Sequence, residues 1–198
     1  MQHTRSNRSI LVIVLAVLLG SLSSGLALTK EQILEISAKP HSVEKLHPGL
    51  SIFPHAREYT IQLELLLLQQ KRTAKMELKV KEKIVEGRYI VTQFTPRGAP
   101  AKMTIITTFH PPSGLYLKTT LEPDGNIQEA VGTSTPGSRA ICWQSIGQSS
   151  GQPSTFSLEQ HTETQSTWTE ITMMNDTPQL RTRGIAVKKA AEKPADVK

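Results

Sequence analysis

The chain has 198 residues, a formal net charge of +6 and an aromatic content of only 5%, and this length corresponds to one domain with short appendages. This charge is mild and falls well short of the basic cluster on one face that a nucleic-acid-binding protein needs. The only cysteine, Cys142, excludes an intrachain disulfide and a paired-cysteine metal site, and we expect it to act as a small apolar filler of the interior.

Residues 1–27 have the three parts of a secretory signal peptide. Arg5 and Arg8 precede the apolar run 10–19, and small residues lead up to Ala27, where we expect cleavage. The apolar run is interrupted from Gly20 onward, so it falls short of the roughly 20 residues that span a membrane. We therefore expect an exported protein, periplasmic or secreted, that meets the membrane only transiently through this segment. The alternative is an uncleaved segment that anchors the chain in the membrane.

A short helix and an irregular lead-in are expected over residues 28–57. Thr29 is a candidate N-cap with Gln32 three positions later, which is the spacing of a capping box, and Pro40 ends the helix. A helix of this length is not stable alone, so it must pack on another element. We expect it to pack on the segment 58–70, because residues 65–68 are all leucine and need cover on both faces.

From residue 58 onward, apolar and polar residues alternate with a period of two, which is typical of half-buried strands. The clearest strand is 73–85, where Met76, Leu78 and Val80 share one face and the other face carries a row of lysines. We interpret this lysine row as keeping the sheet soluble rather than as a binding surface. The predicted strands span residues 58–70, 73–85, 88–95, 103–109, 115–121, 127–133, 139–146, 154–164, 167–174 and 180–188.

Short polar turns connect these segments, and Asp124-Gly125 is a strong hairpin signal. Connections this short join antiparallel neighbours, because a parallel crossover needs a dozen or more residues. The sequence therefore predicts an all-β fold: an antiparallel meander of about ten strands over residues 58–188 that closes into a barrel or half-barrel. The charged tail 189–198 has no apolar periodicity and is expected to be disordered.

Several strand and turn residues carry a resemblance to known proteins: Gly87-Arg88-Tyr89, Tyr116, Asp124-Gly125, Gly132, Trp143 and Gly184. Over roughly residues 50–188 the chain resembles uncharacterised bacterial lipocalin-like (calycin-type) exported β-barrel domains. That resemblance implies a barrel and a bias toward small apolar ligands, without an established activity. A second resemblance, to periplasmic half-barrel carriers of lipoproteins and lipids, implies a curved and open sheet.

No group of residues indicates an enzyme. The segment 147–151 matches the G-x-S-x-G pattern around Ser149, but a nucleophile elbow needs a helix after it, and here Pro153 and a strand follow. We expect no catalytic residue, no metal ion and no cofactor; a hydrolase using Ser149 or a histidine is the least favoured alternative. Five histidines have no ligand spacing and are expected at the surface or in loops: His41, His47, His55, His110 and His161.

The favoured function is a non-enzymatic binding module that holds a lipid or another apolar small molecule inside the barrel. This expectation depends on one-sided strands whose buried faces mix methionine, leucine, isoleucine and threonine. The alternative is a structural or interaction protein whose own side chains fill the barrel. The residues expected to line the ligand site are Met76, Leu78, Val80, Met103, Ile105, Phe109, Leu115, Leu117, Phe156 and Leu158.

Overall fold

The computed structural model describes residues 28–42, 44–53, 58–96, 102–135, 137–146, 154–162, 165–175 and 177–187. The predictions for the signal segment 1–27, for His55, for Ser149 and for the tail 189–198 lie outside the described residues. Within these ranges, no helix is both long enough and apolar enough to cross a membrane.

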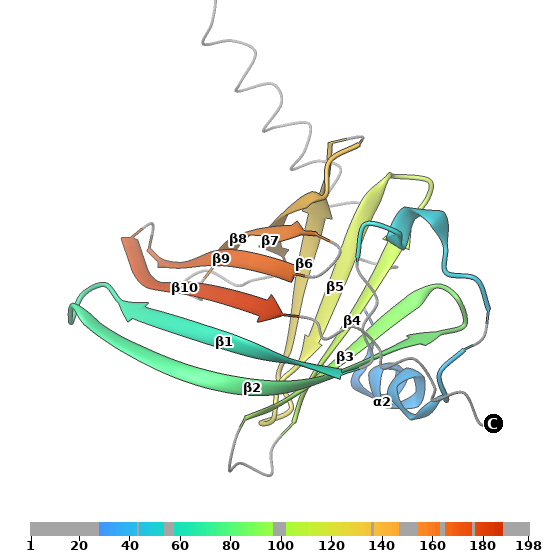
Figure 1. The fold of residues 1–198 in the computed structure, drawn as a ribbon, viewed down its shortest axis with the longest axis horizontal. Coiled ribbons are helices and arrows are strands. Elements are labelled where there is room, and N and C mark those ends of the chain that lie inside the picture. The colour runs from blue at the N-terminus through green and yellow to red at the C-terminus, as the bar shows by residue number, and fades with distance from the viewer. Residues whose placement is uncertain are drawn as a thin grey trace, which may run out of the picture.

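In this part of the chain, ten antiparallel strands close into a barrel (Figure 1). Each strand pairs with its neighbours in sequence, and the first strand also pairs with the last, from Thr60 opposite Val187 to Leu67 opposite Leu180. The predicted all-β antiparallel meander is confirmed, and of the two predicted forms it takes the closed one. The strands are β1 (Glu58–Leu67), β2 (Arg72–Val85), β3 (Tyr89–Pro96), β4 (Met103–His110), β5 (Leu115–Leu121), β6 (Ile127–Thr133), β7 (Ala140–Ile146), β8 (Ser154–His161), β9 (Gln165–Met174) and β10 (Thr177–Val187).

Helix α2 (Lys30–Ala38) precedes the barrel and begins at the predicted capping box. The backbone N–H of Thr29 donates to Gln32 Oε1 over 2.9 Å, and the backbone N–H of Gln32 donates to Thr29 Oγ1 over 3.3 Å. These two bonds satisfy N–H groups that have no partner within the first turn of a helix. The capping prediction is therefore confirmed.

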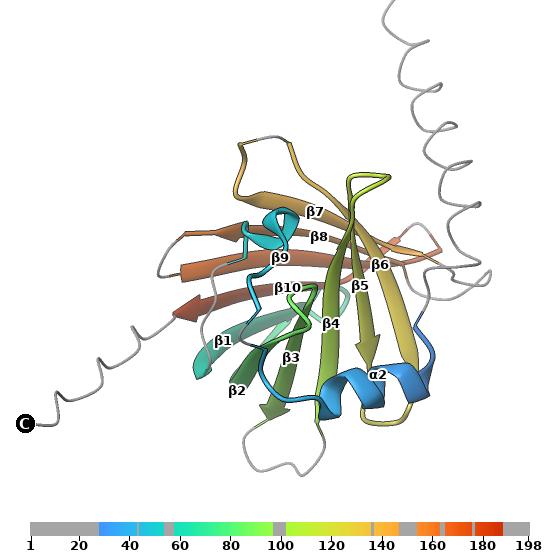
Figure 2. The same cartoon turned by 90° about the vertical axis from the view of Figure 1, so that its right-hand side faces the viewer.

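Helix α2 packs on the outside of the barrel, but not on the predicted strand (Figure 2). The prediction that it covers the leucines of β1 is wrong, and Leu67 is 38% exposed. The outer face of the neighbouring strands offers a better apolar surface, because four buried side chains meet there from β2, β3, β4 and β5. With Ile33 and Ile36 of the helix they form one core cluster: Val85, Val91, Ile106 and Leu121.

Polar contacts hold the C-terminal end of α2 on the barrel. The Lys83 ammonium of β2 donates to the carbonyl oxygen of Ser37 over 2.6 Å and also to that of Lys39. Lys39 in turn lies 2.8 Å from the carboxylate of Glu86. Because the carbonyl groups at a helix C-terminus attract positive charge, one lysine of the row predicted to face solvent has a structural role as well.

A one-turn 3-10 helix, η1 (Pro48–Leu50), closes one end of the barrel. It brings Leu50 and Phe53, which are 0% and 8% exposed, against the starts of β3, β5 and β7. In an antiparallel meander these three starts lie at the same end. The lead-in predicted to be irregular therefore forms a plug, in which Phe53 packs with Ile90, Tyr116, Ile141 and Trp143.

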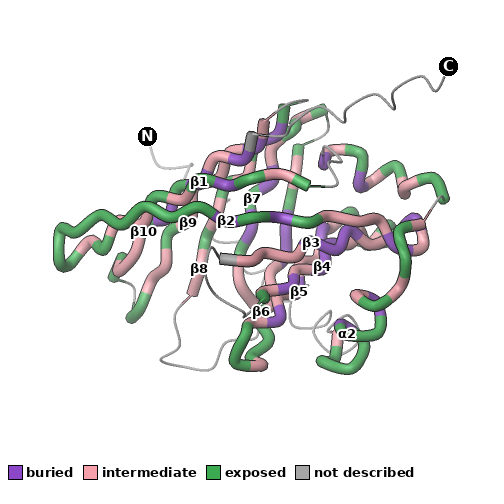
Figure 3. Tube along the Cα trace, turned by 60° about the horizontal axis from the view of Figure 1, so that its bottom comes forward, coloured by how far each residue is buried: buried purple, intermediate pink, exposed green. Residues whose placement is uncertain are grey.

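The opposite end of the barrel has no comparable plug among the described residues. There the ends of β1, β2 and β10 project beyond the rest of the sheet and are mostly exposed or half-buried (Figure 3). Met76 of β2 lies in this projecting part and is 42% exposed. One end of the barrel is therefore plugged, and the described residues at the other end are largely exposed to solvent.

Candidate functional site

The barrel interior contains a cavity of about 340 Å³, which lies within the range of roughly 300–1,000 Å³ typical of small-molecule sites. Its apolar lining consists of Phe53, Ile61, Leu63, Leu78, Ile90, Phe94, Met103, Ile105, Trp168 and Ala186. Its ionisable lining consists of Tyr59, Glu82, Lys118, Glu122, Glu159, His161 and Glu170. Neutral polar side chains complete it: Thr92, Thr107, Thr120, Gln128, Ser157, Ser166 and Thr182. The interior is therefore more polar than the sequence suggested.

The predicted ligand-lining residues are found in three places. Those that line the cavity are Leu78, Met103 and Ile105. Val80 and Phe109 also point inward, but they belong to packed clusters beside the cavity, and Met76 shares their orientation at the projecting end of β2. The other four lie on the outer face of the barrel and not in the cavity: Leu115, Leu117, Phe156 and Leu158.

Strands β5 and β8 therefore have the opposite orientation to the predicted one. Lys118 of β5 and Glu159 of β8 line the cavity, so the residues on either side of them point outward. On β5 the outward-facing residues include apolar ones, and α2 covers one of them, Leu121. On β8 no such cover exists among the described residues, and Phe156 and Leu158 are 46% and 42% exposed. The interior accepts the charged residues because they pair with one another.

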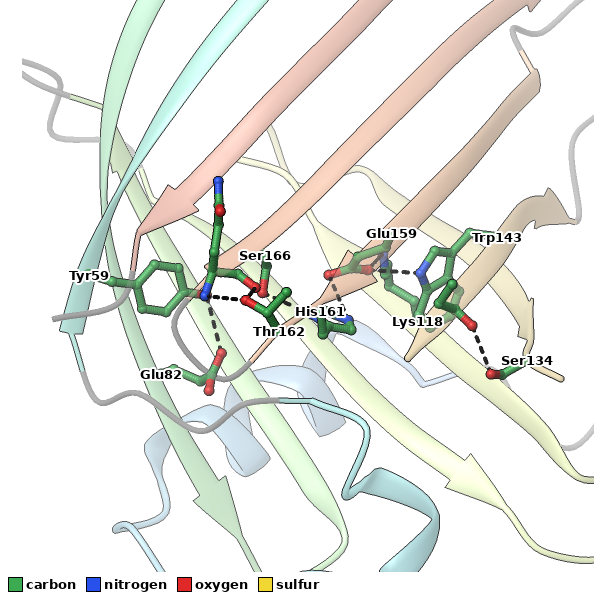
Figure 4. Close-up of polar contacts among 11 residues, drawn as sticks. Tyr59, Glu82, Lys118, Ser134, Trp143, Glu159, His161, Thr162 and Ser166 are labelled. Atoms are coloured by element: carbon green, nitrogen blue, oxygen red, sulfur yellow. Dashed lines mark hydrogen bonds and ion pairs between the residues drawn. The ribbon is translucent and has the colours of Figure 1, made fainter. Parts of the chain in front are cut away.

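Glu159 is the centre of this polar network (Figure 4). Its Oε2 accepts a hydrogen bond from Trp143 Nε1 over 2.9 Å and lies 3.4 Å from the Lys118 ammonium. Its Oε1 lies 3.6 Å from His161 Nε2. Lys118 also stands over the Trp143 ring, 3.9 Å from the ring centroid. Burial opposes ionisation of Glu159, but these three neighbours outweigh it and hold the pKa of the carboxyl below its usual range.

A second carboxyl group in the cavity is held by a tyrosine. The Tyr59 hydroxyl donates to Glu82 Oε2 over 3.2 Å (Figure 4). Burial, together with the Glu82 carboxylate, raises the pKa of Tyr59. The hydroxyl therefore stays protonated and acts as a donor at neutral pH.

His161 and Ser166 form a buried pair at the base of the β8–β9 hairpin. The His161 Nδ1 lies 2.9 Å from Ser166 Oγ, and the two residues are directly opposite one another in the register. With Glu159 beyond the ring, this places a serine, a histidine and a carboxylate in a row, as in a serine nucleophile with its base. Glu159 already holds Lys118 and Trp143, so we interpret the row as part of a cross-strand polar network.

Glu170 of β9 faces the cavity opposite Ser157 of β8. Among the described residues it has no hydrogen bond or ion pair partner. Burial raises the pKa of its carboxyl, and Lys118, acting at longer range, opposes that effect only in part. Glu170 is therefore the carboxyl group of the cavity with the weakest compensation from the protein.

Two glycines make room for the two tryptophans of the inner face. A Cβ atom on Gly184 would lie 2.0 Å from Trp168 Cζ2, and one on Gly132 would lie 2.7 Å from the Trp143 ring. Each glycine is directly opposite its tryptophan on the neighbouring strand. Neither has a positive φ, so these glycines are required for space and not for backbone conformation.

Several site residues were not identified from the sequence. His161, expected at the surface or in a loop, is 5% exposed. The Cys142 prediction is also wrong: Trp143 takes the inward position, and Cys142 is exposed. The only available signal was the period of two at positions 157, 159 and 161 of β8. That period separates two faces without indicating which one points into the barrel.

Of the other described histidines, His41 and His47 lie in the irregular lead-in, as predicted, and His110 is the last residue of β4. His41 accepts a hydrogen bond from the Ile84 N–H, His47 accepts one from the Gly49 N–H, and His110 contacts Ser113. In the part of the chain that the structure describes, no three His, Cys, Asp or Glu side chains form a group that could hold a metal ion. The sequence matches no protein-family model and no curated protein.

Proposed function

We propose that this protein is an exported, non-enzymatic binding module that holds a small amphipathic molecule inside its barrel. The observation that supports the proposal is the cavity of about 340 Å³ inside the barrel, because small barrels with a structural role fill their interior with side chains. The closed antiparallel architecture is consistent with the lipocalin-like resemblance. Export rests on the signal-like sequence of residues 1–27.

The two sides of the cavity favour a ligand that has both an apolar and a polar part. The apolar side chains come mainly from β1 to β4, and include Leu63, Leu78 and Met103. The charged side chains come mainly from β5, β8 and β9. A purely apolar ligand would take water away from this charged side without replacing its hydrogen bonds, which costs free energy. A ligand with a polar group at one end avoids that cost.

A pair of adjacent tryptophan substitutions tests the proposal. Ser157→Trp places an indole in the cavity, whereas Leu158→Trp places it on the exposed outer face of the same strand. The neutral fluorescent probe N-phenyl-1-naphthylamine should bind the wild type saturably. We expect S157W to weaken this binding by at least about tenfold and L158W to leave it unchanged.

Circular dichroism shows whether each variant is folded, and Ser157→Leu provides a smaller filler if S157W is not. Equal probe binding by folded S157W and L158W, or the lack of saturable binding to the wild type, would contradict the proposal. Native mass spectrometry of protein isolated from its own compartment then identifies the bound molecule.

A second candidate function, interaction through the outer face, is favoured by one observation. Phe156 and Ile171 are directly opposite one another on β8 and β9 and are 46% and 37% exposed, with Leu158 beside them. Exposed apolar patches of this kind mark contact surfaces. Sedimentation of the wild type and of Phe156→Ser tests it: a wild-type dimer that the substitution dissociates would support this candidate.

A further inference from the structure

The charge of the cavity is opposite in sign to that of the whole chain. Among the described residues, four glutamates line the cavity, against one lysine and one histidine, whereas the chain as a whole carries +6. The excess of basic residues lies elsewhere: Lys75, Lys79 and Lys81, for example, are exposed on the outer face of β2. The negative interior is therefore a property of the site and not of the composition.

The lysine among these lining residues already forms an ion pair. Lys118 lies 3.4 Å from the Glu159 carboxylate. Among the described residues, the Glu122 carboxyl group accepts a hydrogen bond from a neutral amide, Gln128 Nε2, over 2.7 Å. Glu170 has no hydrogen bond or ion pair among the described residues. Among the lining residues that the structure describes, carboxyl groups therefore outnumber basic groups even after the Lys118–Glu159 ion pair is counted.

Aromatic rings accompany these carboxyl groups. Phe53, Tyr59, Phe94 and Trp168 all line the cavity, and the face of an aromatic ring attracts a cation within about 6 Å. The protein shows how its interior holds an ammonium group, because Lys118 lies between a carboxylate and the face of an indole, 3.9 Å from the ring centroid. Glu and Trp recur together at positions 170 and 168 on the inner face of β9.

We propose that the ligand of this cavity is an amphipathic organic cation, an alkylamine or a quaternary ammonium compound, whose positive group lies against Glu170 and Trp168. Its chain extends along the apolar side formed by β1 to β4. The inference rests on the proposed function and specifies the chemical class of its ligand. A metal ion does not fit the same groups, because the four glutamates are spread over a cavity of about 340 Å³ and form no metal-binding group among the described residues.

A set of ligands with one chain length and different charge tests this inference. Octyltrimethylammonium, octylamine, octanol and octanoate are titrated against the wild type at pH 7.5 and physiological salt, by displacement of N-phenyl-1-naphthylamine and by calorimetry. We expect both cations to bind at least about tenfold more tightly than octanoate, because opposite charges attract and like charges repel strongly in a low-dielectric interior. The affinity for octanol is expected to lie between the affinity for the two cations and the affinity for octanoate.

The decisive variant is Glu170→Gln, with Glu77→Gln as its matched control. Both remove one carboxylate from a strand, but Glu77 is exposed on the outer face of β2. We expect E170Q to weaken cation binding at least about fivefold and to strengthen octanoate binding, and E77Q to change neither by more than about twofold, since exposed charges are screened by salt. Glu122→Gln replaces E170Q if that variant does not fold.

The outcomes separate the inference from the proposed function. If octanoate or octanol binds as tightly as the cations, or if E170Q behaves like E77Q, the cation inference is overturned while the binding function stands. If none of the four compounds binds, both are overturned. Cation preference in the wild type that E170Q abolishes supports both.

Discussion

Replacing Gly184 with alanine tests the packing that shapes the cavity wall. The new Cβ atom would lie 2.0 Å from Trp168 Cζ2 and 2.2 Å from Cε2, whereas carbon atoms in contact are about 3.5–4.0 Å apart. The indole must therefore move by about 1.5–2 Å, and overpacking of this kind costs about 1–3 kcal/mol. Alanine by itself favours a strand over glycine by about 0.5–1 kcal/mol. The net effect of G184A alone is thus smaller than its steric cost.

A double-mutant cycle isolates the steric cost. Wild type, G184A, W168A and the double variant are unfolded with urea and followed by circular dichroism. In the W168A background the added methyl group meets no indole, so G184A becomes neutral or stabilising there. We expect a coupling free energy of about 1–3 kcal/mol between the two positions. Additivity within about 0.5 kcal/mol would refute the close packing of Trp168 on Gly184.

Three further predictions concern stability. Ile33→Ala should lower the free energy of unfolding by about 2–5 kcal/mol, because Ile33 is 0% exposed under α2. Leu34 is 53% exposed, so Leu34→Ala should change the same free energy by less than about 0.5 kcal/mol. Equal effects of the two variants in urea unfolding would contradict the packing of the helix on the barrel. Lys118→Met should lower the free energy of unfolding by about 3–5 kcal/mol at pH 7. The loss should be smaller at acidic pH, because Glu159, which has a lowered pKa in the folded state, becomes protonated there. A loss that does not depend on pH would contradict the ion pair. Burial raises the pKa of Glu170 above 4.5, so the folded state holds this proton more tightly than the unfolded state does. The free energy of unfolding of the wild type relative to E170Q should therefore be greatest below pH 4.5 and should fall as the pH rises through the raised pKa. A difference that grows with pH would contradict this assignment.

The sequence was sufficient for the architecture because that depends on local signals. The period of two, the short polar turns and the capping box of Thr29 each act over a few residues, and together they predict antiparallel strands and a leading helix. The short connections explain why neighbouring strands pair, but they left the closed and the half-barrel forms both open, because closure depends on the long-range pairing of β1 with β10. The place of α2 could not be predicted in this way, because several strands have apolar outer positions and only their three-dimensional arrangement decides which face the helix covers.

The composition of the cavity was harder to predict for a related reason. On β5 and β8, apolar and polar residues alternate equally well in either orientation, and the usual rule places the apolar set inside. The structure reverses that rule, because Lys118 and Glu159 compensate one another in the interior, and Glu159 gains a hydrogen bond from Trp143. Such compensation depends on residues from three strands, so it is not visible in any one of them.

The hydrogen-bonded seam between β1 and β10 has a consequence for how the chain reaches its native state. It joins the beginning of the barrel to its end, so the ring cannot form until the last strand is available, and the high contact order implies slow folding. A chain that lacked β10 would have two bare edges, β1 and β9, open to pairing with other copies. Protection from aggregation therefore depends on the last strand of the barrel.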